Sequence, residues 1–437
     1  MKMSGTSVSP RCCRPCRRSN SADRANKVTP VDQESRSALA KGLILVGVAT
    51  LVGNGAAFLL SMVAARVLGP ADFGAFGALI GILLILATIG ISTQALAARR
   101  VATGSSDQAD VEGQLIRLAT VVGAGIVVLG VVMAWPLGQV FSIPWLAVAT
   151  GIASLGFVIF GSAAMGIAQG REEHVRFSVS FIALNGSRAL GGIIGVIALS
   201  SVVGAGIGVL VGCIIGALIA YRRVCPGAWA PAIRDGMAAE LGHIVHALMV
   251  LFTLTNIDVL LARLFLSETG SSEYSVGVLL AKIAFFLPNA VVIVLFPKMS
   301  GQQSRRPVLV ATGLTAVVGL IITLFAFFFG PLVVRILGGV QYESMADNMW
   351  LFALEGSAFA LVQVLLYSRL AAQDRKAVIA VWVALASLVA IVAIWRNGSL
   401  VEIVTTVVGV SLVLAVVGLF LDNRGSSKYE IPIESAE

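Results

Sequence analysis

Twelve long apolar stretches, separated by short polar turns, occupy this chain from about residue 41 to about residue 422. A helix needs about 20 residues to cross the ~30 Å hydrocarbon core of a bilayer, and each stretch is about that long or longer. Because lipid offers the backbone no hydrogen-bonding partners, such stretches fold as transmembrane α-helices. The sequence therefore predicts an all-α integral membrane protein with about 12 spans. We expect the spans at roughly 43–66, 74–98, 117–141, 145–169, 177–199, 202–221, 241–264, 275–297, 308–329, 347–370, 377–395 and 400–421.

The charged residues are few and unevenly placed. They make up 12% of the chain, against ~25% in soluble domains, and no loop between spans is long enough to be a domain. Lys and Arg concentrate in cytoplasmic loops, and nine of them lie in the first 41 residues. We therefore expect both termini in the cytoplasm, and the net charge of +8 needs no nucleic-acid partner. Four arginines then fall on the outer side: Arg66, Arg263, Arg335 and Arg396.

The chain also contains an internal repeat. Residues 64–81 read AARVLGPADFGAFGALIG, and residues 261–282 read LARLFLSETGSSEYSVGVLLAK. Each combines the end of an apolar helix, an Arg, a turn with an acidic residue, an aromatic residue and a helix rich in small residues. Residues 166–178 and 369–380 match in the same order. Because six spans return the chain to its starting side, the two halves share one orientation, which predicts six-helix lobes related by a pseudo-twofold axis along the membrane normal.

This repeat gives the expected domain boundaries. They are a disordered basic cytoplasmic tail at 1–40, an N-terminal lobe at 41–223, a cytoplasmic linker at 224–238, a C-terminal lobe at 239–422 and a cytoplasmic tail at 423–437. The first tail is rich in Ser and Arg, which is typical of disorder. Its cysteines, Cys12, Cys13 and Cys16, lack a second ligand pair, so we expect no zinc site there.

Three segments carry a family resemblance. They are RVLGPADFGAFGALIGILLILATIGISTQALAARR (66–100), NIDVLLARLFLSETGSSEYSVGVLLAKIAFFLPNAVVIVLFPKMS (256–300) and ILGGVQYESMADNMWLFALEG (336–356). In order and spacing they resemble the polysaccharide-biosynthesis flippases of the multidrug/oligosaccharidyl-lipid/polysaccharide exporter superfamily. The resemblance implies two six-helix lobes around a central cavity that opens alternately to either side of a bacterial inner membrane.

The same resemblance implies a cargo and partners. The cargo would be a glycan on a polyisoprenyl pyrophosphate, moved across the bilayer, and glycosyltransferases or a glycan polymerase would be partners. Drug exporters of the superfamily share the architecture, so an ion-coupled multidrug or small-molecule exporter is the alternative. A membrane enzyme of glycan polymerisation or ligation is a further alternative, but its catalytic residues need a sizeable outer loop. We expect no catalytic residues, no metal and no cofactor, and no ATP-binding glycine-rich motif is visible.

Four ionisable residues lie deep in the expected spans, where charges are costly and mark candidate functional sites. Asp258 and Lys282 lie about twelve residues before and after the turn near Gly270, so they reach similar depths and could form an ion pair. Glu355 reaches a comparable depth from the same side. These three residues form either a neutralised structural network or a site that couples transport to Na⁺ or H⁺. Arg188, near the middle of its span, has no acidic residue near it in sequence and is a candidate phosphate ligand.

Three further residues are candidates for function. Arg66 and Arg263 occupy equivalent outer ends of the first and seventh spans, where each would either cap its own helix or contact phosphate on the outer side. Pro288 interrupts the hydrogen bonding of the eighth span and is a candidate hinge. His243 and His246 share a helical face with Glu240, but we expect an interfacial role rather than a metal site.

Overall fold

The computed structural model describes the backbone of residues 30–103, 108–224, 236–299, 306–371 and 375–426. Side chains are described from residue 44 to residue 419, except at 104–107, 225, 227–235, 288–309 and 366–374. Residues 1–29, with the three cysteines of the N-terminal tail, and residues 427–437 lie outside the described residues. The chain up to Ile44 is a separate unit, and the residues from Leu45 onward form one compact unit, to which the following description refers.

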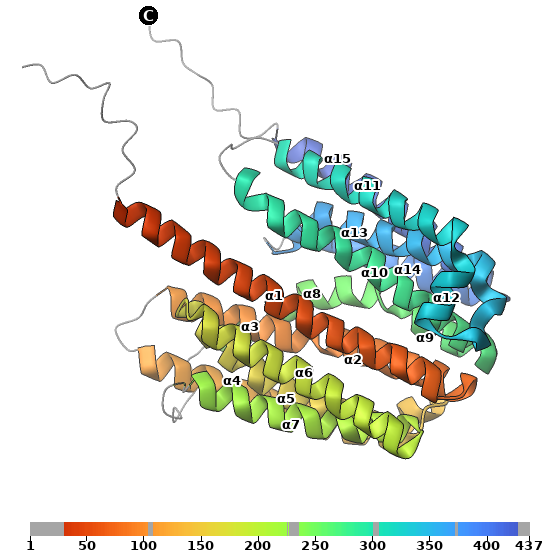
Figure 1. Cartoon of the computed structure of the whole chain (residues 1–437), viewed down its shortest axis with the longest axis horizontal. Coiled ribbons are helices and arrows are strands. Elements are labelled where there is room, and N and C mark those ends of the chain that lie inside the picture. The colour runs from red at the N-terminus through yellow and green to blue at the C-terminus, as the bar shows by residue number, and fades with distance from the viewer. Residues whose placement is uncertain are drawn as a thin grey trace, which may run out of the picture. The chain divides into compact units, whose positions relative to one another are not determined.

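The described part of the chain consists of fifteen α-helices and one 3₁₀ helix (Figure 1). They are α1 (Pro30–Val67), α2 (Pro70–Leu86), α3 (Thr88–Ala102), α4 (Gln108–Val140), α5 (Trp145–Gly170), α6 (His174–Leu199), α7 (Val202–Val224), α8 (Met237–Leu254), α9 (Ile257–Phe265), α10 (Glu268–Met299), α11 (Arg306–Phe328), α12 (Gly330–Leu337), η1 (Val340–Asn348), α13 (Met349–Ala371), α14 (Arg375–Ile394) and α15 (Leu400–Ser426). Twelve segments are long and apolar enough to cross a membrane, which confirms the predicted number. We call the membrane side that holds the end of α15 the near side, and the opposite side the far side.

One of the predicted continuous spans is interrupted. The seventh span breaks after α8, immediately before α9, where Asn256 departs from helical geometry with φ −138° and ψ −5°. There the side-chain amide of Asn256 donates to the carbonyl of Phe252, at 2.9 Å. A side chain that bonds a nearby backbone carbonyl competes with helical hydrogen bonds, and this favours the break. The second span continues from α2 into α3, because Ala87 between them has helical dihedrals and its N–H donates to the Leu83 carbonyl at 2.8 Å.

Glycines determine how closely the helices of the N-terminal lobe approach. A methyl group added at Gly195 of α6 would collide with the backbone carbonyl of Gly204 in α7, and one added at Gly191 would collide with the carbonyl of Gly208. Such small residues allow backbone contact where lipid supplies no hydrophobic drive for association. At these glycines no space for a side chain therefore remains between α6 and α7.

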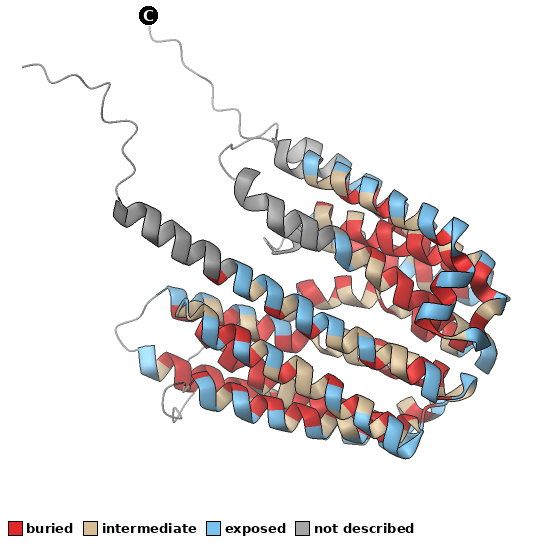
Figure 2. Ribbon diagram, viewed as in Figure 1, coloured by how far each residue is buried: buried red, intermediate tan, exposed pale blue. Residues whose placement is uncertain are grey.

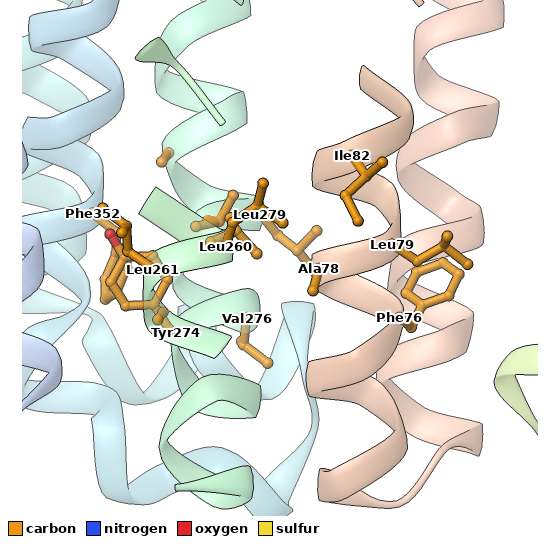
Figure 3. Close-up of a cluster of buried hydrophobic side chains, with 14 of the residues drawn as sticks. Phe76, Ala78, Leu79, Ile82, Leu260, Leu261, Tyr274, Val276, Leu279 and Phe352 are labelled. Atoms are coloured by element: carbon orange, nitrogen blue, oxygen red, sulfur yellow. The ribbon is translucent and has the colours of Figure 1, made fainter. Parts of the chain in front are cut away.

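The two lobes meet through α2, which packs against α9 and α10 of the C-terminal lobe. Figure 3 shows this junction, with Leu79 and Ile82 on α2 and Leu260 and Leu279 on the facing helices. The buried core continues through both lobes, whereas apolar side chains on the outer helix faces are exposed (Figure 2). Exposed apolar side chains are expected where the surrounding solvent is lipid.

Candidate functional site

A polar cluster lies inside the C-terminal lobe, where α9, α10 and α13 meet. Asp258 of α9 and Glu355 of α13 are both buried, and the two carboxyl groups interact electrostatically with each other and with Tyr274. The Tyr274 hydroxyl is 3.5 Å from Glu355 Oε1, and its ring packs edge-on against Phe352 at 5.0 Å between centroids. The cluster forms because Asp258 follows the break in the seventh span and begins the short helix α9.

Several oxygen atoms of this cluster have no hydrogen-bond donor. They are Asp258 Oδ1, Glu355 Oε2 and the nearby Asn256 Oδ1, all buried. Buried polar atoms are normally satisfied, so these three unsatisfied acceptors are candidates to bind a proton or a cation. An all-oxygen set suits H⁺ or a hard cation such as Na⁺ better than a soft metal.

Lys282 lies beside this cluster. It interacts electrostatically with Asp258, yet the two side chains, both described, do not form an ion pair. Tyr274, which the sequence analysis did not select, donates a hydrogen bond to Glu355. The only sequence feature that could have pointed to it is its position in α10, four residues after Gly270 and on the helix face that includes Val278.

Arg188 lies in the N-terminal lobe, midway along α6, and is half-buried. Its backbone is close to α7, because a methyl group on Gly212 would lie 2.9 Å from the Arg188 Cα atom. The neighbouring Ser187 hydroxyl donates to the Gly212 carbonyl at 2.7 Å and fixes this crossing. Among the described residues, no carboxylate pairs with the Arg188 guanidinium. The structure thus contains a cation without an anionic partner at the middle of a membrane span.

Arg66, at the far-side end of α1, reaches into the C-terminal lobe. Its guanidinium donates to the carbonyls of Arg335 and Ile336, at 3.5 and 2.5 Å, in the last turn of α12. The carbonyls at a helix C-terminus lack partners within the helix and attract cations. Beside this contact, the Gln341 amide donates to the Ala65 carbonyl at 2.6 Å.

Arg263, at the far-side end of α9, reaches in the opposite direction. Its guanidinium donates to the carbonyls of Phe141 and Ser142 of the N-terminal lobe, both at 2.9 Å, just beyond the end of α4. It also donates to the Ser271 hydroxyl at 3.1 Å. In the repeat, α4 corresponds to α11 and its extension α12. Each arginine therefore binds the equivalent helix end in the other lobe, and the expected capping of its own helix is not the main contact.

A separate contact joins the lobes on the near side. Glu240 of α8 pairs with Arg99 at 2.6 Å and with Arg100, both at the end of α3. The two histidines bind elsewhere: His243 Nδ1 contacts the Ala239 carbonyl at 2.7 Å, and His246 accepts from the Trp382 indole at 3.4 Å. No set of three metal-ligating side chains occurs among the described residues. Pro288 lies in α10 where only the backbone is described, so its role as a hinge stays a prediction.

The sequence matches the family model described as "polysaccharide biosynthesis protein" over residues 39–300, which is more than half of the chain. The chain belongs to this family. It is a multi-pass membrane transporter with the fold of the multidrug/oligosaccharidyl-lipid/polysaccharide exporter (MOP) superfamily, as the sequence resemblance implied. A comparison with curated proteins gave no match.

Solved structures agree on the fold of this family member. An inward-facing multidrug resistance MATE family transporter of the MOP superfamily matches with a TM-score of 0.66 and 15% identity, over 86% of this chain and 96% of that one. A MOP superfamily transporter from Pyrococcus furiosus matches with a TM-score of 0.63 and 15% identity, over 89% and 96%. An outward-facing MATE family transporter matches with a TM-score of 0.60 and 15% identity, over 90% and 96%. Two lobes of six spans each are therefore the architecture of this protein.

Proposed function

We propose that this protein flips a polyisoprenyl-pyrophosphate-linked glycan across a bacterial inner membrane by alternating access. Both termini would be cytoplasmic, the far side would be the outside, and the segments 41–223 and 239–422 would be the moving lobes. Glycosyltransferases would supply the cargo on the inner face, and a polymerase would use it on the outer face. The observation that carries this proposal is Arg188, the mid-span cation without an acidic partner.

The chemistry of Arg188 favours an anionic cargo. A charge in the middle of a membrane is costly unless a partner compensates it, and the described residues supply none. A pyrophosphate offers oxygens that a planar guanidinium binds in a bidentate manner. The family match supports a glycan-linked carrier as the source of that pyrophosphate.

The acidic cluster of the C-terminal lobe provides a means of coupling. Two buried carboxyl groups that interact with each other, as Asp258 and Glu355 do, are costly to ionise together, so a bound proton or cation would stabilise the pair. A proton or Na⁺ that binds there in one conformation and leaves in the other would link the lobe's movement to an ion gradient. Lys282 would compete for Asp258 when the cation has left.

The far-side contacts of Arg66 and Arg263 support an assignment of this conformation to the state closed on the far side. The two residues would act as paired interlobe latches, which open when the cavity turns outward. In the outward state both guanidiniums would lose their carbonyl partners and become available to phosphate.

Reconstituted vesicles test the cargo directly. Purified protein in proteoliposomes should move a labelled lipid-linked oligosaccharide between leaflets, and Arg188→Ala should abolish this movement while the protein stays folded. Arg188→Lys should keep part of the activity, because a point charge remains. Arg335→Ala is the matched control, since it removes an arginine that pairs with Glu343 within its own lobe.

Other outcomes would favour the alternatives. Uptake of a cationic drug without movement of the oligosaccharide would indicate a multidrug exporter. The similarity of this chain to a multidrug resistance MATE transporter is the observation that favours this alternative. Chemical conversion of the lipid-linked glycan would indicate an enzyme. Full flipping by Arg188→Ala would remove Arg188 from the cargo site.

A further inference from the structure

A groove of about 670 Å³ runs between α14 and α15 in the C-terminal lobe. Ligand sites in proteins typically have volumes of about 300–1,000 Å³, so its size is that of a binding site. Its walls are mainly apolar, and Val383 and Val413 on its rim are 59% and 65% exposed. Along α15 the lining runs from Thr405 to Val417, about 18 Å at 1.5 Å per residue. This length slightly exceeds one leaflet, which is about half of the ~30 Å hydrocarbon core.

The far-side end of the groove is polar and cationic. Arg396, between α14 and α15, lines it and donates to the Thr405 hydroxyl at 3.1 Å. The adjacent Trp395 is 76% exposed, and exposed Trp is typical of the level of lipid headgroups. The nearby Glu402 instead accepts from the backbone of Gly398 at 3.0 Å, and no ion pair of Arg396 occurs among the described residues.

Arg396 differs in this respect from the other far-side arginines. Arg66 and Arg263 bind carbonyls of the opposite lobe, and Arg335 pairs with Glu343. Arg396 has only a neutral hydroxyl as a partner. Its positive charge is therefore available to an anion at the membrane surface.

The equivalent helix pair in the other lobe packs more closely. There the glycines of α6 and α7, such as Gly195 and Gly204, bring the two backbones into contact. In the α14/α15 pair, Gly409 lines the groove and a methyl group added to it would meet no atom within 4 Å. The two helix pairs thus differ: α6 and α7 are in backbone contact at these glycines, whereas α14 and α15 enclose the groove.

We propose that this groove binds an anionic phospholipid of the far-side leaflet, with its phosphate at Arg396 and one acyl chain between α14 and α15. Charge complementarity selects the headgroup, and the apolar walls accept the chain. The bound lipid would fill a space that neither helix fills. This proposal is independent of the transported cargo.

Native mass spectrometry tests this lipid binding. The full-length protein in detergent is titrated with phosphatidylglycerol or with phosphatidylcholine of the same acyl chains. The unaltered protein should bind phosphatidylglycerol more tightly. Arg396→Ala should weaken phosphatidylglycerol about fivefold, the factor expected for loss of one cation near an anionic headgroup, and weaken phosphatidylcholine less, because the choline ammonium offsets the charge of its phosphate. Arg396→Lys should keep most of the preference.

A second variant tests the apolar part. Gly409→Leu places a side chain in the groove at a position where an added methyl group meets no atom within 4 Å, and it should weaken both lipids. Gly125→Leu is the matched control, because Gly125 is also an exposed helical glycine with no atom within 4 Å of an added methyl group, and it should bind as the unaltered protein does. Unchanged binding in Gly409→Leu, or an unchanged preference for phosphatidylglycerol in Arg396→Ala, would overturn the proposal. Equal unfolding midpoints would show that each variant is folded.

Discussion

Asp258 and Glu355 are almost a hundred residues apart in the sequence, and both are buried in one polar cluster. Interacting like charges in a low-dielectric interior repel each other, so the pair favours a shared proton or a bound cation. The Tyr274 hydroxyl donates to Glu355 Oε1, but Glu355 Oε2 and Asp258 Oδ1 remain without a donor. A neutral amide at either position would remove the need for a cation.

We therefore predict that Glu355→Gln folds, inserts and reaches an unfolding midpoint at least equal to that of the unaltered protein. Gradient-driven flipping in vesicles should become insensitive to the imposed Na⁺ or H⁺ gradient, because the site no longer binds and releases a cation. Thr406→Val, which removes a hydroxyl that donates only to Glu402 of its own helix, is the control. Full gradient dependence in Glu355→Gln would assign the cluster to structure alone.

A second ion pair at the residue scale is structural. Arg171 follows α5 and binds the Glu112 carboxylate of α4 and, at 3.0 Å, the Val224 carbonyl of α7. The hydrogen bond to Glu112 raises the pKa of Arg171 above its ordinary value, which shows how strongly the pair favours the charged guanidinium. Glu112 is buried, with 2% of its side chain exposed.

Removing one partner of this pair leaves an uncompensated buried charge. We predict that Arg171→Ala lowers the free energy of unfolding by about 3 kcal/mol, at the lower end for buried pairs because Arg171 is partly exposed. Arg171→Met combined with Glu112→Gln should recover much of the loss. Unfolding midpoints in detergent measure both, and a single variant as stable as the unaltered protein would show that water compensates the charge.

Helix elements differ between the lobes in how closely they pack. The glycine contacts of α6 and α7 leave no space for a side chain, whereas α14 and α15 stand apart and enclose the groove. The break between α8 and α9 is another property of an element, because it positions Asp258 at the start of a helix that a continuous span would not have. These local departures from regular, tightly packed helices coincide with the sites proposed above.

At this scale we predict that Gly195→Ala destabilises the protein by about 1–3 kcal/mol, the usual cost of overpacking, because its methyl group collides with the Gly204 carbonyl. Gly125→Ala should be neutral or stabilising by up to about 1 kcal/mol, since Ala favours helix and nothing lies within 4 Å of the new atom. Thermal unfolding of the two purified variants compares them. Equal midpoints would mean that α6 and α7 separate at little cost.

In the whole molecule, contacts between the lobes on the far side include two arginine latches related by the internal repeat. Phe73 of α2 also packs against Tyr342 of η1, with ring centroids 6.0 Å apart, so the far-side contact is apolar as well as polar. On the near side the contact between Glu240 and the two arginines of α3 is ionic. Alternating access requires that such contacts break on one side at a time.

We predict that Arg66→Ala combined with Arg263→Ala shifts the protein toward the state open on the far side. Spin labels can be placed at Leu199 and Thr269, which are exposed far-side positions in the two lobes. Double electron–electron resonance should then report longer distances between the labels. Arg335→Ala, which removes a far-side arginine paired within its own lobe, should leave the distances unchanged. Unchanged distances in the double variant would show that the latches do not hold the lobes together.

The orientation of the whole molecule has its own test. A single cysteine at Ser399 should react with a membrane-impermeant thiol reagent in intact cells, whereas one at Thr103 should react only after permeabilisation. Both positions are exposed and therefore accessible to the reagent. Ser271, also on the far side, is buried and would be a poor labelling position. The reverse pattern would place the termini outside.

The sequence alone determined the twelve spans and the transporter family, because apolar length and motif order are local properties that any packing must respect. Only the tertiary structure decided which polar groups meet. Arg66 and Ile336 are 270 residues apart, and Asp258 interacts with Glu355 and Tyr274 as well as with Lys282, from a short helix that begins after a break in its span. Such contacts depend on helix rotation and on how the lobes approach each other, and hydropathy carries information on neither.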